Sequence, residues 1–149
     1  MASADCFRST KTYTNFPCAH RRWRHVGHCA HVHGYSRSFS FTFQCTERTD
    51  NGFVMDFGAL KPVKAWLTEQ FDHTLLLDAD DPLLSDFEAL QEKGACTLVI
   101  YDDVGMEGTA RYVFEWVSAW VSKATAGRVQ LEQVECREND KNSAIYRPA

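Results

Sequence analysis

Apolar and polar residues alternate along several stretches of the chain, and a period of two predicts β-strands. The clearest stretch is 35–43, where three phenylalanines fall on one face and serine or threonine residues on the other. Further strands are expected at 7–16, 52–57, 96–101, 129–137 and 144–146. An Asn-Gly pair predicts a tight turn over 49–52, so the strand at 52–57 is expected to complete a hairpin.

Apolar residues recur every three or four positions in three other stretches, and this spacing predicts helices. The first contains a row of four large apolar residues, Leu60, Val63, Leu67 and Phe71. The other two are expected from position 81 to the glycine at 94, and over 109–123. The resulting order of elements predicts an α+β fold, in which helices pack on one face of an antiparallel sheet.

Length and composition indicate one ordinary globular unit. The 149 residues are 44% hydrophobic and 24% charged, which suits a single domain over 1–149 with a sizeable core. A net charge of −4 argues against nucleic-acid and membrane-surface partners, because both favour basic proteins. Six cysteines without a CxxC pair, and no apolar signal segment at the start, indicate a cytoplasmic protein with free thiols.

Histidines are concentrated in the stretch 19–35, which contains five of the six in the chain together with Cys29. His31 and His33 are two positions apart, so on a strand both imidazoles would point to one face. His20 approaches from upstream. Three imidazoles around an open position are typical of catalytic zinc, and a neighbouring thiol favours a base or nucleophile. The sequence therefore predicts zinc bound by His20, His31 and His33.

Three other features have candidate chemistry. Asp72 and His73 are adjacent, so the carboxylate could tune an imidazole that moves a proton, although such a pair also occurs as a simple helix end. Glu138, if buried, could bind a guanidine-like edge through two parallel hydrogen bonds. The basic run at 21–25 could bind phosphate groups or could form a solvated loop.

Five segments, in order along the chain, resemble motifs of the 6-pyruvoyl-tetrahydropterin synthase / 6-carboxytetrahydropterin synthase family. Residues 16–20 (FPCAH) resemble F-x-x-A-H, and residues 29–34 (CAHVHG) resemble C-x3-H-G-H. Residues 52–61 (GFVMDFGALK) resemble G-x-V-x-D-F-x-x-L-K, and residues 71–75 (FDHTL) resemble L-D-H-x-x-L. Glu138 resembles the glutamate of the terminal E-T…Y segment.

The resemblance implies a T-fold (tunnelling fold) whose subunits form an oligomeric barrel, typically a homohexamer of two stacked trimers with active sites between subunits. The substrate would be 7,8-dihydroneopterin triphosphate, whose side-chain hydroxyls the zinc would bind and acidify. Cys29 would act as the general base, with Asp72 and His73 as its proton-relay partners. Glu138 would anchor the pterin ring, and Thr109 would contact the substrate.

Two reactions occur in the family that these motifs resemble. One eliminates triphosphate and gives 6-pyruvoyltetrahydropterin. The other also releases acetaldehyde and gives 6-carboxy-5,6,7,8-tetrahydropterin, on the route to queuosine and other deazapurines. The three-residue gap between Cys29 and His33 resembles the carboxy type, so we expect a zinc-dependent lyase with that product.

The chain departs from the family pattern at three places. In a gapless alignment Tyr35 occupies the position of the third zinc ligand, so His31 is expected to substitute, with Tyr35 and His28 as alternatives. Arg111 replaces a family glutamate, and an insert at about 78–108 contains its own helix and strand. The departures at Tyr35 and Arg111 leave two other hypotheses open, a zinc-binding T-fold module without catalysis and a related pterin enzyme with another substrate.

Overall fold

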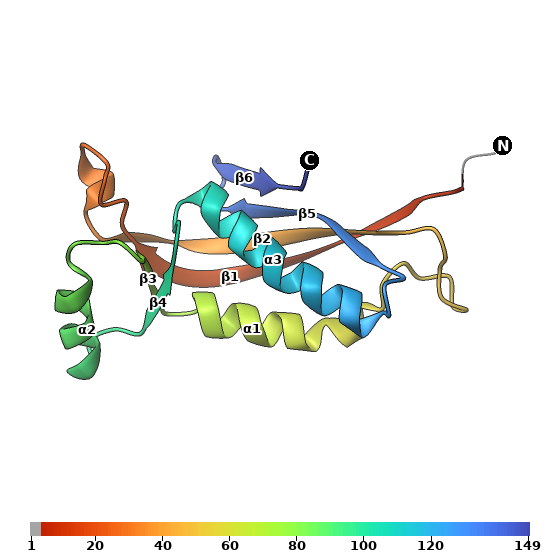
Figure 1. The fold of residues 1–149 in the computed structure, drawn as a ribbon, viewed down its shortest axis with the longest axis horizontal. Helices are drawn as coiled ribbons and strands as arrows, with labels where there is room; N and C mark the ends of the chain where they lie inside the picture. The colour runs from red at the N-terminus through yellow and green to blue at the C-terminus, as the bar shows by residue number, and fades with distance from the viewer. Residues whose placement is uncertain (1–3) are drawn as a thin grey trace.

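The computed structural model describes residues 4–149, which form a six-stranded sheet in the order β4-β3-β1-β2-β5-β6 (Figure 1). Its strands are β1 (Phe7–His20), β2 (His33–Cys45), β3 (Leu75–Asp78), β4 (Leu98–Tyr101), β5 (Gln130–Arg137) and β6 (Ser143–Tyr146). The predicted antiparallel pairing holds for β1, β2, β5 and β6, whereas β3 and β4 run parallel to β1. The sheet is therefore mixed.

Two helices cover one face of this sheet, as the apolar spacing predicted (Figure 1). They are α1 (Lys61–Phe71), which follows the 3-10 turn η2 (Phe57–Leu60), and α3 (Met106–Ala124). The indole ring of Trp66 stacks on that of Trp116, with centroids 4.4 Å apart, and this contact joins the two helices. The third helix, α2 (Leu84–Glu92), has no buried residue and lies beyond β3 and β4 at the edge of the molecule.

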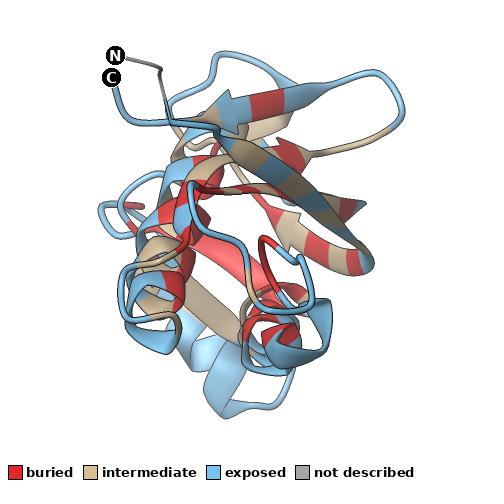
Figure 2. Ribbon diagram, turned by 90° about the vertical axis from the view of Figure 1, so that its right-hand side faces the viewer, coloured by how far each residue is buried: buried red, intermediate tan, exposed pale blue. Residues whose placement is uncertain are grey.

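The core lies between the helices and the sheet. Phe39, Phe41 and Phe43 of β2 are completely buried, and the residues that alternate with them are only half-buried. Figure 2 shows the same alternation as red bands along the strands. Each large apolar side chain that becomes fully buried stabilises the fold by about 1.5–3 kcal/mol.

Membrane insertion through a helix has no support in residues 4–149. Each helix in this part of the chain is too short or too polar to span a lipid bilayer.

The predicted strand at 52–57 is wrong. Val54 and Met55 are adjacent and both buried, so the segment does not alternate. The Arg128 guanidinium donates to the Val54 carbonyl at 2.9 Å, where a strand would use the N–H of a neighbouring strand. The Asp56 side chain then caps η2. The segment is therefore an irregular connection, held by side chains, that leads into the first helix.

Strand β3 has no counterpart among the predicted strands, because all four of its residues are buried and none of them alternates with a polar position. A strand with parallel neighbours is typically covered on both faces, which removes the period of two. β3 pairs with the end of β1 at Ala19 and His20. β1 continues four residues beyond its predicted end at position 16, and these four residues also pair with β2.

Arg37 interrupts the apolar face of β2. It lies two residues before Phe39 on the same side of the strand, and its side chain is completely buried. Its Nη1 donates to the Thr109 hydroxyl at 3.2 Å, whereas Nε and Nη2 have no hydrogen-bond partner within the described chain. A buried charge with an incomplete set of partners destabilises the folded state.

Replacement of Arg37 by methionine is expected to raise the free energy of unfolding of the metal-free chain by about 1–4 kcal/mol, because an apolar side chain of similar length replaces a poorly partnered charge. Urea denaturation followed by circular dichroism measures this change. The free energy of unfolding should rise less in Arg37→Ala, since this change removes the same charge but leaves a cavity. A loss of stability in Arg37→Met would contradict the expectation.

Candidate metal centre

His20 and His33 lie side by side at the end of the β1–β2 hairpin, where they form the last pair of the strand register. Their ring centroids are 4.5 Å apart. The two backbones approach closely here because residue 34 is glycine. A Cβ atom at Gly34 would lie 2.3 Å from the carbonyl oxygen of Cys18. Any other residue type would therefore push the strands apart beside the two imidazoles.

Glu138 completes a compact group of three possible metal ligands. One ligand atom from each of His20, His33 and Glu138 lies within 4.8 Å of the other two. Glu138 directly follows β5, whose last residue, Arg137, pairs with Ser38 of β2. Two imidazoles and a carboxylate suit Zn²⁺ and leave a fourth coordination position free. The donor set therefore fits the metal that the sequence predicts.

His33 has a defined tautomer. Its Nδ1 lies 2.7 Å from the carbonyl oxygen of His31. A carbonyl oxygen can only accept, so Nδ1 carries a proton, and in the neutral ring the lone pair is then on Nε2. Histidines that bind metals commonly donate their other ring N–H to a backbone carbonyl, which fixes the orientation of the ring. His33 is thus arranged as a ligand through Nε2.

His20 is held in the neutral form that metal binding requires. Only 3% of the residue is exposed, and this burial lowers its pKa to about 3, with further lowering from the charges of Arg37, His33 and Arg22. Its Nδ1 is buried and has no hydrogen-bond partner among residues 4–149. A neutral imidazole with an unused buried nitrogen is well suited to bind a cation.

The other predicted or alternative ligands lie outside this group of three. β2 begins at His33, so His31 precedes the strand, and the period of two does not place the two side chains on one face. His31 and His28 are both exposed. Tyr35 packs edge-on against His33, with 5.9 Å between ring centroids. Zinc binding by His31 stays a prediction.

The residues predicted to move protons come from two separate segments of the chain. Cys29 is half-buried in the 3-10 turn η1 (His28–Ala30). Asp72 and His73 form the suggested pair, with 2.6 Å between Oδ1 and Nδ1, and the His73 side chain is 83% exposed. His73 and Tyr35 belong to the wall of one open hollow of about 480 Å³. His73 is therefore open to solvent. It lines the same hollow as Tyr35, whose ring packs against the candidate ligand His33.

Thr109, predicted to contact substrate, is completely buried in the first turn of α3. Its hydroxyl lies 2.7 Å from the Tyr101 hydroxyl and accepts a hydrogen bond from Arg37. Burial raises the pKa of Tyr101, which keeps that phenol protonated. Sequence reasoning missed Arg37, and the available signal was a charged residue in phase with the phenylalanines of β2. Arg111 pairs with Glu115 on the exposed side of α3.

Comparisons with known proteins agree with this fold. A 6-carboxy-5,6,7,8-tetrahydropterin synthase of Rickettsia felis is 36% identical over 67 residues, which cover 44% of this chain and 49% of that protein, about half its length. The enzyme of the same name from Aquifex aeolicus is 24% identical over 156 residues, covering 93% of this chain and 96% of that protein. The crystal structure of an uncharacterized protein from Wolinella succinogenes has a TM-score of 0.82 at 21% identity, covering 97% of this chain and 99% of that chain.

The match to a protein family covers nearly the whole chain. Residues 9–149 fit the family model described as 6-pyruvoyl tetrahydropterin synthase. This range includes all of β1 except its first two residues, the other five strands described, the three α-helices and the three clustered side chains. The chain therefore belongs to the 6-pyruvoyl tetrahydropterin synthase family.

Proposed function

We propose that the chain is a zinc-dependent lyase that converts 7,8-dihydroneopterin triphosphate and water into 6-carboxy-5,6,7,8-tetrahydropterin, acetaldehyde and triphosphate. The observation that carries this proposal is the group formed by His20, His33 and Glu138, in which His20 is buried and neutral. Family membership supports a pterin substrate, and the names of the Rickettsia felis and Aquifex aeolicus relatives support the carboxylated product.

His20, His33 and Glu138 are the residues that would hold the ion. Bound zinc would supply a Lewis acid that polarises the hydroxyl groups of the substrate side chain. Glu138 has a competing predicted role, because a carboxylate can also bind the guanidine-like edge of a pterin ring through two hydrogen bonds. Its proximity to both imidazoles favours the role of metal ligand.

Cys29 is the proposed general base. It lies on the loop that joins the strand ends carrying His20 and His33, so the thiol and two metal ligands belong to one continuous segment. Asp72 holds the Nδ1 proton of His73, which leaves Nε2 to exchange a proton. Because the His73 side chain is exposed, this proton can pass on to solvent. Direct contact of Thr109 with substrate is proposed from the family resemblance.

The active form is proposed to be a cytoplasmic homohexamer, with the pterin triphosphate as its small-molecule partner. β4 and β6 are the edge strands of the sheet, and Ile145 of β6 is 55% exposed. The free backbone groups of an edge strand can pair with a second copy of the chain. The sheet edges thus support assembly through β-strands.

Incubation of zinc-loaded protein with 7,8-dihydroneopterin triphosphate is expected to yield 6-carboxy-5,6,7,8-tetrahydropterin and an equal amount of acetaldehyde. Mass spectrometry of the pterin and an aldehyde assay measure the two products. Protein stripped with a chelator is the control and should be inactive. A 6-pyruvoyl product would contradict the proposed reaction, and the absence of turnover with zinc bound would support a T-fold module without catalysis.

Glu138→Gln is expected to weaken zinc binding by more than the roughly 10–100-fold that loss of a supporting partner costs, because it removes a charged ligand. His31→Ala is the matched variant and should keep zinc affinity close to that of the unmodified chain. Competition with a chromophoric chelator measures both affinities. The opposite pattern, with zinc lost in His31→Ala and only pterin binding lost in Glu138→Gln, would assign His31 as the ligand and Glu138 as the ring anchor.

Cys29→Ala is expected to lower kcat by about 100-fold or more, because a general base contributes roughly that much. Zinc content and pterin binding should stay unchanged, since the thiol lies outside the group of three ligands. Steady-state kinetics, metal analysis and equilibrium binding measure the three properties. Cys96→Ala, a second half-buried cysteine outside this loop, is the control. A nearly full rate in Cys29→Ala would exclude the proposed base.

A further inference from the structure

The loop of residues 21–32, here called the histidine loop, carries Cys29 but has little regular structure of its own. Its only helical element is η1, closed by hydrogen bonds from the Ala30 N–H to the Gly27 carbonyl (3.1 Å) and from the His31 N–H to the His28 carbonyl (3.0 Å). One such turn does not hold a side chain in place by itself. The position of Cys29 therefore depends on contacts with other parts of the chain.

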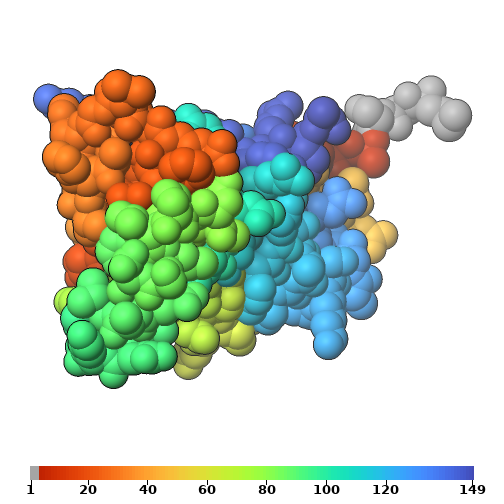
Figure 3. Space-filling model, turned by 60° about the vertical axis from the view of Figure 1, so that its left-hand side comes forward, coloured from red at the N-terminus to blue at the C-terminus, as the bar shows by residue number. Residues whose placement is uncertain are grey.

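The 78–108 segment, which extends from the end of β3 to the first turn of α3, provides these contacts. Figure 3 shows the orange residues of the histidine loop lying directly on the green residues of this segment. Three arginines of the loop pair with aspartates of the segment: Arg21, Arg22 and Arg24. The basic run that the sequence singled out is therefore engaged by carboxylates of the chain itself.

The pair of Arg21 and Asp81 is the most buried of these contacts. Nε and Nη2 of Arg21 donate to the two Asp81 oxygens at 2.7 and 3.0 Å, a bidentate arrangement. The Asp81 side chain is 0% exposed and that of Arg21 is 14% exposed. Asp81 is itself fixed, because its Oδ1 accepts a hydrogen bond from the Leu83 N–H at 2.9 Å. The pair is thus a rigid anchor at the start of α2.

The third nitrogen of Arg21 connects this anchor to the turn that contains Cys29. Nη1 donates to the carbonyl oxygen of Ala30, the next residue after Cys29, at 3.3 Å. On the other side of the turn, the Cys29 carbonyl accepts a hydrogen bond from the Arg22 N–H at 2.8 Å. One guanidinium therefore joins a buried carboxylate of the 78–108 segment to the backbone beside the thiol.

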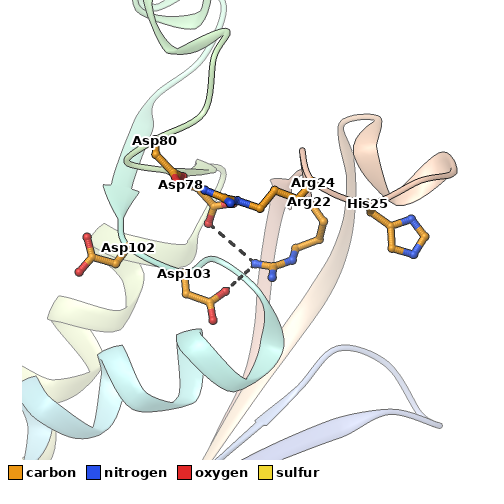
Figure 4. A pocket seen from close by; sticks show the side chains of 7 residues that line it. All are labelled: Arg22, Arg24, His25, Asp78, Asp80, Asp102 and Asp103. Atoms are coloured by element: carbon orange, nitrogen blue, oxygen red, sulfur yellow. Dashed lines mark hydrogen bonds and ion pairs between the residues drawn. The ribbon is translucent and has the colours of Figure 1, made fainter.

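The arginines of the outer pairs are more exposed to solvent than Arg21. Arg22 and Arg24 line a hollow of about 450 Å³ together with four aspartates and His25, and Figure 4 shows Arg22 pointing between Asp78 and Asp103. Arg24 pairs with Asp80, and both side chains are more than half exposed. Exposed ion pairs of this kind contribute little to stability. The Arg24–Asp80 pair therefore offers a control for the buried pair.

We propose that Asp81 is a positioning residue for Cys29, and that it acts through the Arg21 guanidinium on the Ala30 carbonyl. This gives the 78–108 segment a role in setting the geometry of the site. The inference rests on the proposed function in assigning Cys29 as the base. The contacts that carry it are independent of that assignment.

The first test compares Asp81→Asn with Asp80→Asn in the zinc-loaded full chain. Loss of the Asp81 charge is expected to lower kcat by about tenfold to a hundredfold and to leave KM within about threefold, because a displaced base slows the chemical step more than it weakens binding. Asp80→Asn should retain the kinetics of the unmodified chain. Equal losses of kcat in the two variants would overturn the proposal.

The second test does not require activity. Alkylation of Cys29 by iodoacetamide, followed by peptide mass spectrometry, should be at least about fivefold faster in Asp81→Asn, because the turn opens more often. Cys18, Cys45 and Cys136 are buried and serve as internal references, since general unfolding would expose them too. Unchanged Cys29 alkylation, or equal acceleration at all four thiols, would overturn the proposal.

Arg21→Lys keeps the positive charge but loses the bidentate fork and the third N–H, so it should accelerate Cys29 alkylation in the same way. This variant keeps the test decisive if Asp81→Asn does not fold. Full activity in Cys29→Ala would defeat the proposed base. Selective acceleration of Cys29 alkylation would still establish the anchoring contact, so the two failures can be told apart.

Discussion

The close approach of β1 and β2 at Gly34 is the constraint on which the candidate centre depends. The Cys18 carbonyl occupies the space that a Cβ atom would need, so the two long strands stay paired up to their last residues only with glycine at this position. That pairing brings the rings of His20 and His33 together. It also brings the two ends of the histidine loop, residues 21–32, close to each other. The 78–108 segment, whose aspartates pair with the histidine loop, is placed by a different contact, the pairing of β3 with the end of β1.

Around the β1–β2 hairpin, features that suit the binding of a metal ion also lower the stability of the fold. His20 and Arg37 both have buried nitrogen atoms without hydrogen-bond partners in residues 4–149, and such atoms destabilise a fold unless something else uses them. Sequences that fold consistently at every level commonly break a rule at functional sites. Burial, together with the positive charge of the Arg37 guanidinium, lowers the pKa of His20 and so keeps that imidazole neutral.

Local periodicity predicts those elements in which one face meets the core and the other meets solvent, as in β2, α1 and α3. It fails where both faces are covered, as in β3, and where a side chain satisfies the backbone, as at Val54. For the candidate centre, residue type and spacing predict His20 and His33 as ligands. Glu138 joins them only because β5 pairs with β2, and Arg37 is buried only because the helices cover that face. The strand pairing and the burial both depend on residues far apart in the sequence, so no local sequence pattern predicts either of them.

The anchoring of the histidine loop also sets an order of events in the life of the chain. Arg21 and Asp81 are 60 residues apart, and Arg22 and Asp103 are 81 residues apart. As the chain emerges from the ribosome, the β1–β2 hairpin is therefore available long before the carboxylates that hold its loop. The hairpin can form early, whereas η1, the turn that contains Cys29, reaches its final geometry only after β3, α2 and β4 have docked. The turn that carries Cys29 is thus completed only after the 78–108 segment has folded, and the group of three possible ligands only after Glu138 has joined the two histidines.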